Sequence, residues 1–377
     1  MRVTPEELSK AHAQLGDPEE ILHQRRTLYA AAVSLCTGTE VQVDVEQDTL
    51  DNPAVRGHLG AVLSGRSRYT ASARQQLTDL VAPGFGTEVG GWPVRLASAP
   101  VAPSALAGAL QRIAGELTRH GDESGGLALL TVEQGGAIDE AWDRLVDGVL
   151  LAVRVAPELA MDLLPHVSLF AVVVTEESAR LGSASAREYP GLILIPKPRS
   201  ALEVAEALFH EGAHQKFFDF GMTRAMLGPL SPQAPRFAPP WAPPGAPEWP
   251  LEQSVAAWHA YHCLAAFYGC LHGVPDELPL DDGSLLPKAA SRAAEIGRYL
   301  RRQGSFLGQD AHALIAALEG APPDDPSPVD EAAAEVSGAV DDGSILVYPA
   351  GRRTLVVKRG APPVLYWVDP RLGSRPR

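Results

Sequence analysis

The segment 207–218, A-L-F-H-E-G-A-H-Q-K-F-F, constrains the fold of this chain more than any other segment. His210 and His214 lie four positions apart, so on an α-helix their side chains share one face, about one turn apart. Two imidazoles at that spacing form half of a first-row metal site, and Glu211 between them can act on a metal-bound water. The motif predicts a metal-dependent enzyme, and it fits both a zinc hydrolase and an iron oxygenase.

The residues before the motif predict how its helix begins. The apolar run 191–195, G-L-I-L-I, is typical of a short buried strand. Ser200 is placed as the N-cap of the next helix, with Glu203 three residues later closing a capping box. We therefore expect a strand that leads into a motif helix over 201–219, as in zincin-like sites.

The rest of the chain predicts an α+β fold that is mainly α. Helical periodicity recurs at 4–36, 53–63, 103–119, 138–164, 251–270, 288–303 and 308–319. A second buried strand is expected at 167–174, and short strands within 84–102. Three apolar runs in 344–369 predict a small antiparallel meander. We divide the chain into a catalytic domain, 1–320, and a β-meander appendage, 329–377.

The third metal ligand is expected on the helix 251–270. His259 and His262 lie three positions apart there, both on an otherwise apolar stripe. His259 is the first choice as a ligand, and His262 the second, as a ligand or a hydrogen-bonding neighbour. Glu248 and Glu252 are the carboxylate alternatives, because two histidines and one carboxylate are typical of non-haem iron. Four other histidines are expected at the surface or at helix ends: His12, His23, His58 and His120.

The segment 228–250 holds nine prolines and so cannot be helix or sheet interior. Its aromatic residues Phe237, Trp241 and Trp249 would be unusual in a solvated linker. Since long ordered loops tend to be functional, we expect this loop to pack near the site and contact the substrate.

Charge and hydropathy exclude some functions. The net charge of −14 disfavours nucleic acid and anionic membranes as partners. The sequence contains no run of 18 apolar residues, so we predict no transmembrane helix. The N-terminal residues show no apolar signal segment, and three widely placed cysteines imply no disulfide framework. These features favour a cytoplasmic enzyme, and they leave its oligomeric state open.

The chain resembles the HExxH proteins of bacterial gene clusters for ribosomally made, post-translationally modified peptides. The likeness rests on the strand and motif helix, G-L-I-L-I-P and A-E-A-L-F-H-E-G-A-H-Q-K-F, and on the loop F-A-P-P-W and the helix ending A-A-F-Y. The element D-N-P-A-V-R at 51–56 is similar to the family's His-Pro-Tyr-Val-Arg element. The family usually carries arginines in the loop, where this chain has Ala242 and Trp249.

The resemblance implies an iron(II)/2-oxoglutarate-dependent peptide β-hydroxylase acting on a precursor peptide. Iron would be held by His210, His214 and a histidine of the later helix. A cation is needed for the distal carboxylate of 2-oxoglutarate. The candidates nearest the motif in sequence are Lys216, Lys197 and Arg199.

Two other interpretations stay open. A zinc metallopeptidase would use Glu211 as the general base for the attacking water. A metal-free member of the family would act only as a peptide-binding module. The sequence does not identify the peptide or the modified residue.

Overall fold

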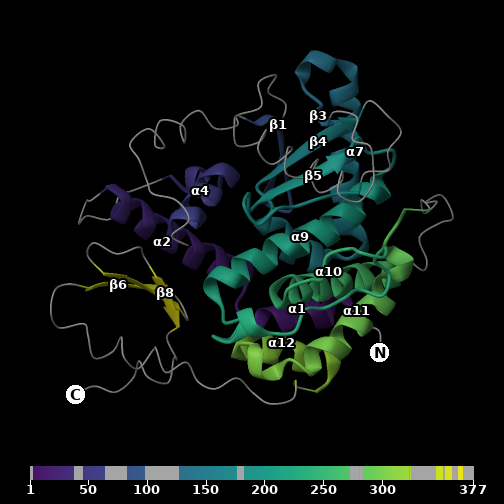
Figure 1. Cartoon of the computed structure of the whole chain (residues 1–377). Coiled ribbons are helices and arrows are strands. Elements are labelled where there is room, and N and C mark those ends of the chain that lie inside the picture. The colour runs from purple at the N-terminus through teal and green to yellow at the C-terminus, as the bar shows by residue number, and fades with distance from the viewer. Residues whose placement is uncertain are drawn as a thin grey trace.

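We analysed a computed structural model of the chain (Figure 1). The structure describes residues 3–37, 46–63, 83–97, 127–175, 182–271, 280, 283–321 and 323, together with the strand residues 345–350, 353–358 and 364–367. The predicted helix at 103–119 lies outside the described residues. The described part is mainly helical with a small mixed sheet, which confirms the predicted fold class.

The central strand of the mixed sheet is β4 (Leu169–Thr175). It pairs along its length with β5 (Leu192–Pro196) in parallel. At its start it pairs with β2 (Trp92–Ala97), which forms a hairpin with β1 (Pro83–Val89), and at its end with β3 (Leu127–Leu129). Sequence analysis predicted β4 and β5 but not β3, which has only three residues.

The motif helix α9 (Ala201–Thr223) follows β5 after a short connection, as predicted. The Ser200 side chain accepts a hydrogen bond from the Glu203 backbone N–H and so caps the helix. The predicted capping box is wrong, because the Glu203 carboxylate accepts hydrogen bonds from the backbone N–H and the Nε–H of Arg199 instead.

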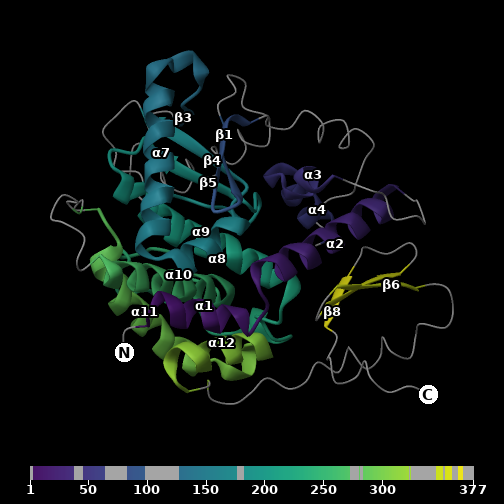
Figure 2. The ribbon, with the colours of Figure 1, turned by 180° about the vertical axis from the view of Figure 1, so that it is seen from behind.

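Helices pack in layers below the sheet (Figures 1 and 2). Helix α9 lies between the sheet and α10 (Leu251–Cys270), which packs on α11 (Leu286–Arg301). The first helix, α1 (Pro5–Ala13), lies against α8 (Pro157–Leu163), α10 and α12 (Gln309–Glu319). One apolar core runs through these layers and encloses the side chains of α9 and α10 that face inward.

The helical pattern at 138–164 forms two helices rather than one. Helix α7 (Gly136–Val155) ends at Ala156, and α8 (Pro157–Leu163) begins at the following proline. Proline cannot donate the backbone hydrogen bond that a continuous helix needs, and it disfavours helical backbone in the residue before it. The break turns α8 so that it packs against both α1 and α9.

A buried ion cluster joins α2 (Pro18–Thr37) and α4 (Pro53–Leu63) to the motif helix. The Asp219 carboxylate of α9 lies 2.5 Å from the guanidinium groups of Arg25 and Arg56, and 2.6 Å from His166 Nδ1. Burial alone would raise the pKa of Asp219, but the charges of the two arginines hold it well below its ordinary value. Arg56 belongs to the D-N-P-A-V-R element, which thus supports α9 from behind.

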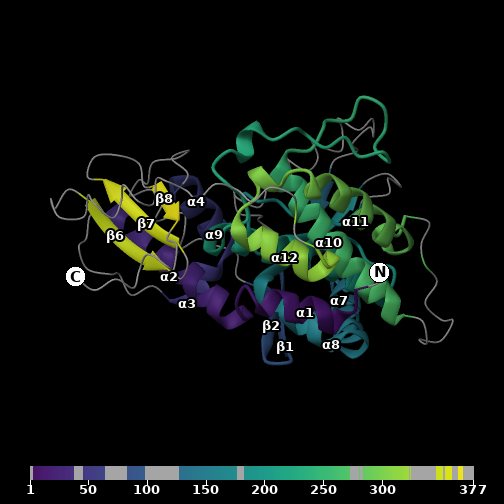
Figure 3. The ribbon, with the colours of Figure 1, turned by 90° about the horizontal axis from the view of Figure 1, so that it is seen from below.

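The C-terminal segment forms the predicted antiparallel meander. Its strands are β6 (Ile345–Ala350), β7 (Arg353–Lys358) and β8 (Val364–Trp367), paired in sequence order. The small sheet lies beside α2, apart from the layered helices (Figures 1 and 3). No described helix is long and apolar enough to cross a membrane.

Candidate metal centre

The two motif histidines meet on the open face of α9. The rings of His210 and His214 have centroids 4.9 Å apart and are nearly perpendicular. Both side chains are partly exposed, whereas most of their neighbours on α9 are buried. Burial together with the Arg292 charge lowers the pKa of His210 to about 4, and burial together with His210 lowers that of His214 to about 4. Both imidazoles are therefore neutral near pH 7, the form that binds metal ions.

Glu211 joins the two histidines in one group, with ligand atoms within 4.8 Å of one another. Its carboxylate accepts hydrogen bonds from Ser183 Oγ at 2.9 Å and from Ser185 Oγ at 2.6 Å. Ala184 forms a bridge with Leu194 of β5, so the serines on either side of it project toward the same face. An added edge segment of the sheet thus fixes the Glu211 carboxylate.

Tyr261 of α10 faces the open site. Its ring centroid lies 5.8 Å from that of His210, and its hydroxyl accepts a hydrogen bond of 2.8 Å from Arg292 Nη1. The Arg292 guanidinium lies 4.9 Å from the ring centroid of Trp241 and 5.4 Å from that of Tyr261. The two aromatic rings therefore hold a cation beside the two motif histidines.

Arg292 is half-buried, and no carboxylate of the described residues forms a salt bridge with it. The three cations proposed from sequence have acidic partners instead. Lys216 is buried 2.5 Å from Asp162 behind the motif helix, Lys197 pairs with Glu140, and Arg199 pairs with Glu203. Among the described residues, Arg292 is thus the cation that lies at the site without an acidic partner.

The proline-rich loop is ordered, and one of its aromatic residues reaches the site. Phe237 and Trp249 pair through two backbone hydrogen bonds of 2.9 and 2.7 Å, which close the loop. Trp241 packs edge-on against Tyr261 with ring centroids 6.1 Å apart. Phe237 and Trp249 contact Trp241 from behind, so a role for them in substrate binding would be indirect.

The structure does not bring His259 or His262 together with the motif histidines. His259 Nε2 lies 2.7 Å from Nε2 of His12, in the interior between α1, α9 and α10. His262 packs on Trp258 with ring centroids 4.8 Å apart, and it lines a separate cavity beside α11. Helical periodicity turns Tyr261, between them in sequence, toward His210 instead. Metal binding by His259 at the open site stays a prediction.

The two acidic alternatives lie at the surface. Glu252 forms a salt bridge with Arg187, and the backbone carbonyl of Glu248 accepts a hydrogen bond from Arg236. Neither joins the group of ligand atoms around His210. Glu211 is the carboxylate that the described structure brings there.

Sequence reasoning missed four residues of the site. Ser183 and Ser185 carry a weak signal, since their alternation beside a strand predicts that they share a face. Tyr261 and Arg292 carry none, because their positions depend on how α10 and α11 pack. Sequence analysis also placed His12 at the surface, which is wrong: its side chain is completely buried.

The donor set suits a catalytic metal ion. His210, Glu211 and His214 supply two neutral imidazoles and one carboxylate, the combination used by non-haem iron, and also within the range accepted by zinc. The buried His210 Nδ1 has no hydrogen-bond partner among the described residues, while its Nε2 lies on the side of Glu211 at 3.9 Å from Oε1. Comparison of the sequence with protein-family models and with curated proteins finds no match.

Proposed function

We propose that this chain is an iron(II)- and 2-oxoglutarate-dependent oxygenase that hydroxylates a side-chain β-carbon of a ribosomally made precursor peptide. Iron would be held by His210 and His214, with the Glu211 carboxylate as the third ligand-type group. When bound, iron and 2-oxoglutarate supply the oxygen chemistry that no protein side chain can perform. The chain's own residues would bind the metal and 2-oxoglutarate, orient the peptide and shield the site from water.

The observation that carries the proposal is Arg292. A 2-oxoglutarate enzyme needs a cation near its metal for the distal carboxylate, and a guanidinium suits a carboxylate because it donates two parallel hydrogen bonds. Arg292 is held against Tyr261 and Trp241, and no acidic partner among the described residues competes for it. A metallopeptidase could also use a cation there, to stabilise the oxyanion of its tetrahedral intermediate, so dependence on 2-oxoglutarate is what separates the two candidates.

Three further contacts support this assignment of roles. Tyr261 receives the Arg292 hydrogen bond and so orients the guanidinium toward the site. Trp241 covers one face of Arg292 and restricts the approach of water. The serine hydroxyls that bind both Glu211 oxygens fix the carboxylate relative to the two imidazoles.

The alternative is a zinc metallopeptidase with Glu211 as general base. The observation that favours it is the HExxH helix itself, in which Glu211 lies beside the imidazole pair. A general base needs a carboxylate oxygen directed at the attacking water, however, and both Glu211 oxygens accept serine hydroxyl hydrogens. We therefore keep the peptidase as the second candidate.

The proposal places the enzyme in the cytoplasm, where a reducing environment keeps iron ferrous and thiols free. Neither Cys263 nor Cys270 forms a disulfide in the described structure, which fits that compartment.

The test is turnover of 2-oxoglutarate by the purified chain. With iron(II), oxygen and 2-oxoglutarate, we expect succinate release, and with a mixed peptide pool a gain of one oxygen mass in a subset of peptides. Replacing iron by zinc should abolish both. Tight zinc binding, no succinate and cleaved peptides would establish the peptidase instead.

A further inference from the structure

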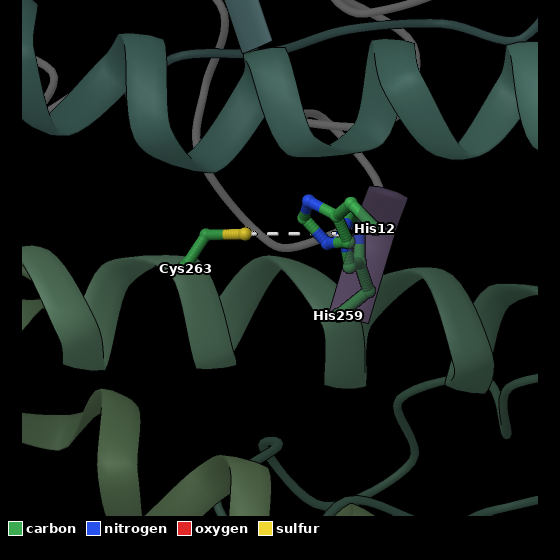
Figure 4. A group of neighbouring side chains, drawn as sticks. All are labelled: His12, His259 and Cys263. Carbon is green, nitrogen blue, oxygen red and sulfur yellow. Dashed lines mark hydrogen bonds between the residues drawn. The ribbon is translucent and has the colours of Figure 1, made fainter. Parts of the chain in front are cut away.

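A second group of ligand-type side chains lies in the protein interior (Figure 4). His259 and Cys263 are four positions apart on α10, and His12 reaches them from the last turn of α1. All three residues have no exposed surface. Cys263 Sγ lies 3.9 Å from His259 Nε2, and the three ligand atoms lie within 4.8 Å of one another.

Hydrogen bonds on the outer side of each imidazole fix which nitrogen carries a proton. His259 Nδ1 lies 3.2 Å from the backbone oxygen of Ala213, which can only accept, so this nitrogen donates. His12 Nδ1 lies 2.5 Å from the Asp162 carboxylate, which also contacts Lys216 Nζ at 2.5 Å. Burial alone would raise the pKa of Asp162, but the charge of Lys216 holds it well below its ordinary value, so the carboxylate is ionised and accepts.

Both Nδ1 atoms therefore carry hydrogens, and both Nε2 lone pairs point toward the centre of the group. The two Nε2 atoms are 2.7 Å apart. Two lone pairs repel at that separation, so a positively charged species must lie between them. It is either an extra proton or a metal cation.

An extra proton would be costly at this position. It would create an imidazolium without exposed surface, near the buried Lys216 ammonium. Burial is the largest cause that lowers the pKa values of His12 and His259, and the Lys216 charge adds to it. The Asp162 carboxylate acts in the opposite direction on both histidines but does not reverse the shift, so the proton is disfavoured. A metal cation differs because Cys263 can neutralise part of its charge as a thiolate.

We propose that His12 Nε2, His259 Nε2 and the Cys263 thiolate supply three of the four ligands of a buried structural site for Zn²⁺, separate from the open centre on α9. Two imidazoles and one thiolate are ligands that zinc prefers, and Asp162 and Ala213 supply the outer hydrogen bonds usual for zinc-bound histidines. Zinc–nitrogen bonds of about 2.1 Å in tetrahedral geometry place the nitrogens about 3.4 Å apart, so binding moves the two Nε2 atoms apart by roughly 0.7 Å from their separation of 2.7 Å.

Binding is balanced by the loss of one proton. The Cys263 S–H bond breaks, the sulfur–zinc bond forms, and the proton leaves to solvent. Because the site has no exposed surface, zinc would enter as the chain folds. It would join α1 to α10 across 247 positions of sequence, independently of any reaction at the open centre.

The experiment uses the full chain with both His210→Ala and His214→Ala, so that the open centre cannot hold metal. We expect this protein, refolded with Co²⁺ as a spectroscopic substitute for zinc, to bind one equivalent and show a sulfur-to-cobalt charge-transfer band. Adding Cys263→Ser should abolish the band. Adding Cys270→Ser should leave it unchanged, because Cys270 lies on the same helix outside the group.

A folded double variant that binds no cobalt, or a band that survives Cys263→Ser, would overturn the proposal and leave a shared proton between the histidines. If the double variant does not fold, the chain with intact His210 and His214 gives the same decision. It should hold two equivalents of zinc, reduced to one by Cys263→Ser, and a single equivalent unaffected by that change would contradict the site. Neither outcome depends on whether the open centre is an oxygenase.

Discussion

The described part of the molecule contains two histidine clusters of similar composition and opposite surroundings. His210 and His214 on α9, and His259 and Cys263 on α10, are both pairs of ligand-type residues four positions apart. The first pair is partly exposed and faces an aromatic-held cation, whereas the second has no exposed surface and is surrounded by core residues. On our two proposals, the same spacing would serve chemistry in one place and stability in the other, and the difference in solvent access is what separates them.

This comparison predicts opposite responses to mutation. A change in the open cluster should remove activity with little loss of stability, because its side chains contribute little to the core. A change in the buried cluster should do the reverse, because its charged groups depend on one another for solvation.

The largest effect is expected from His214→Ala. Removing one of two imidazoles should reduce metal affinity and succinate formation by more than about a hundredfold, since even outer-shell changes cost 10–100-fold. The thermal midpoint of the metal-free protein should hardly change. The control is His23→Ala, which removes an exposed histidine far from the site in sequence. Full activity in His214→Ala would place the metal elsewhere.

Asp162→Asn should have the largest effect on stability. It removes the charge that Lys216 and His12 both contact, and an uncompensated buried ammonium costs roughly 3–5 kcal/mol. Denaturant unfolding measures the loss, while the folded fraction should keep its activity. Glu140→Gln removes the exposed partner of Lys197 and should change stability little. Equal losses of stability from Asp162→Asn and Glu140→Gln would show that the charges of Asp162, Lys216 and His12 do not depend on one another.

Arg292→Ala tests the cation of the open cluster. We expect the KM for 2-oxoglutarate to rise roughly tenfold to a hundredfold, since a charge-assisted bidentate contact is worth about 1.5–3 kcal/mol. Arg292→Lys should recover only part of the loss, because lysine lacks the planar fork. Arg298→Ala on the same helix, exposed and paired with Glu295, is the matched control. An unchanged KM would remove the main support for 2-oxoglutarate.

The smallest effect should come from the paired change Ser183→Ala and Ser185→Ala. It frees the Glu211 carboxylate without removing it, so we expect a loss of activity of about tenfold at unchanged KM for 2-oxoglutarate.

Glu211→Gln separates the two enzyme candidates through metal content. Weaker iron binding supports a ligand role, and full zinc occupancy with no turnover supports the peptidase base.

Local patterns predicted the elements of this site, but not which faces meet. The strand β5, the helix α9 and the helix α10 follow from residues next to one another in sequence, through capping and periodicity. The contact of His259 with His12 depends instead on how α1 packs, 247 positions away. The residues of α10 alone do not show whether His259 faces His12 of α1 or the histidines of α9.

Charged residues were the hardest to place from sequence. Nearness to the motif suggested Lys216, Lys197 and Arg199, yet each pairs with an acid whose position the tertiary fold or the adjacent helix sets. Arg292 lies 82 positions after His210, and it reaches the site because α11 packs on α10. Proline, by contrast, acts locally, so the break at Pro157 was within reach of sequence analysis.

The most direct test of the open centre is spectroscopic and needs no peptide. Anaerobic addition of iron(II) and then 2-oxoglutarate to the purified chain should produce a visible metal-to-ligand charge-transfer band, absent in His214→Ala and weakened in Arg292→Ala. A chain that binds iron(II) at His210 and His214 but shows no band at saturating 2-oxoglutarate would contradict the account.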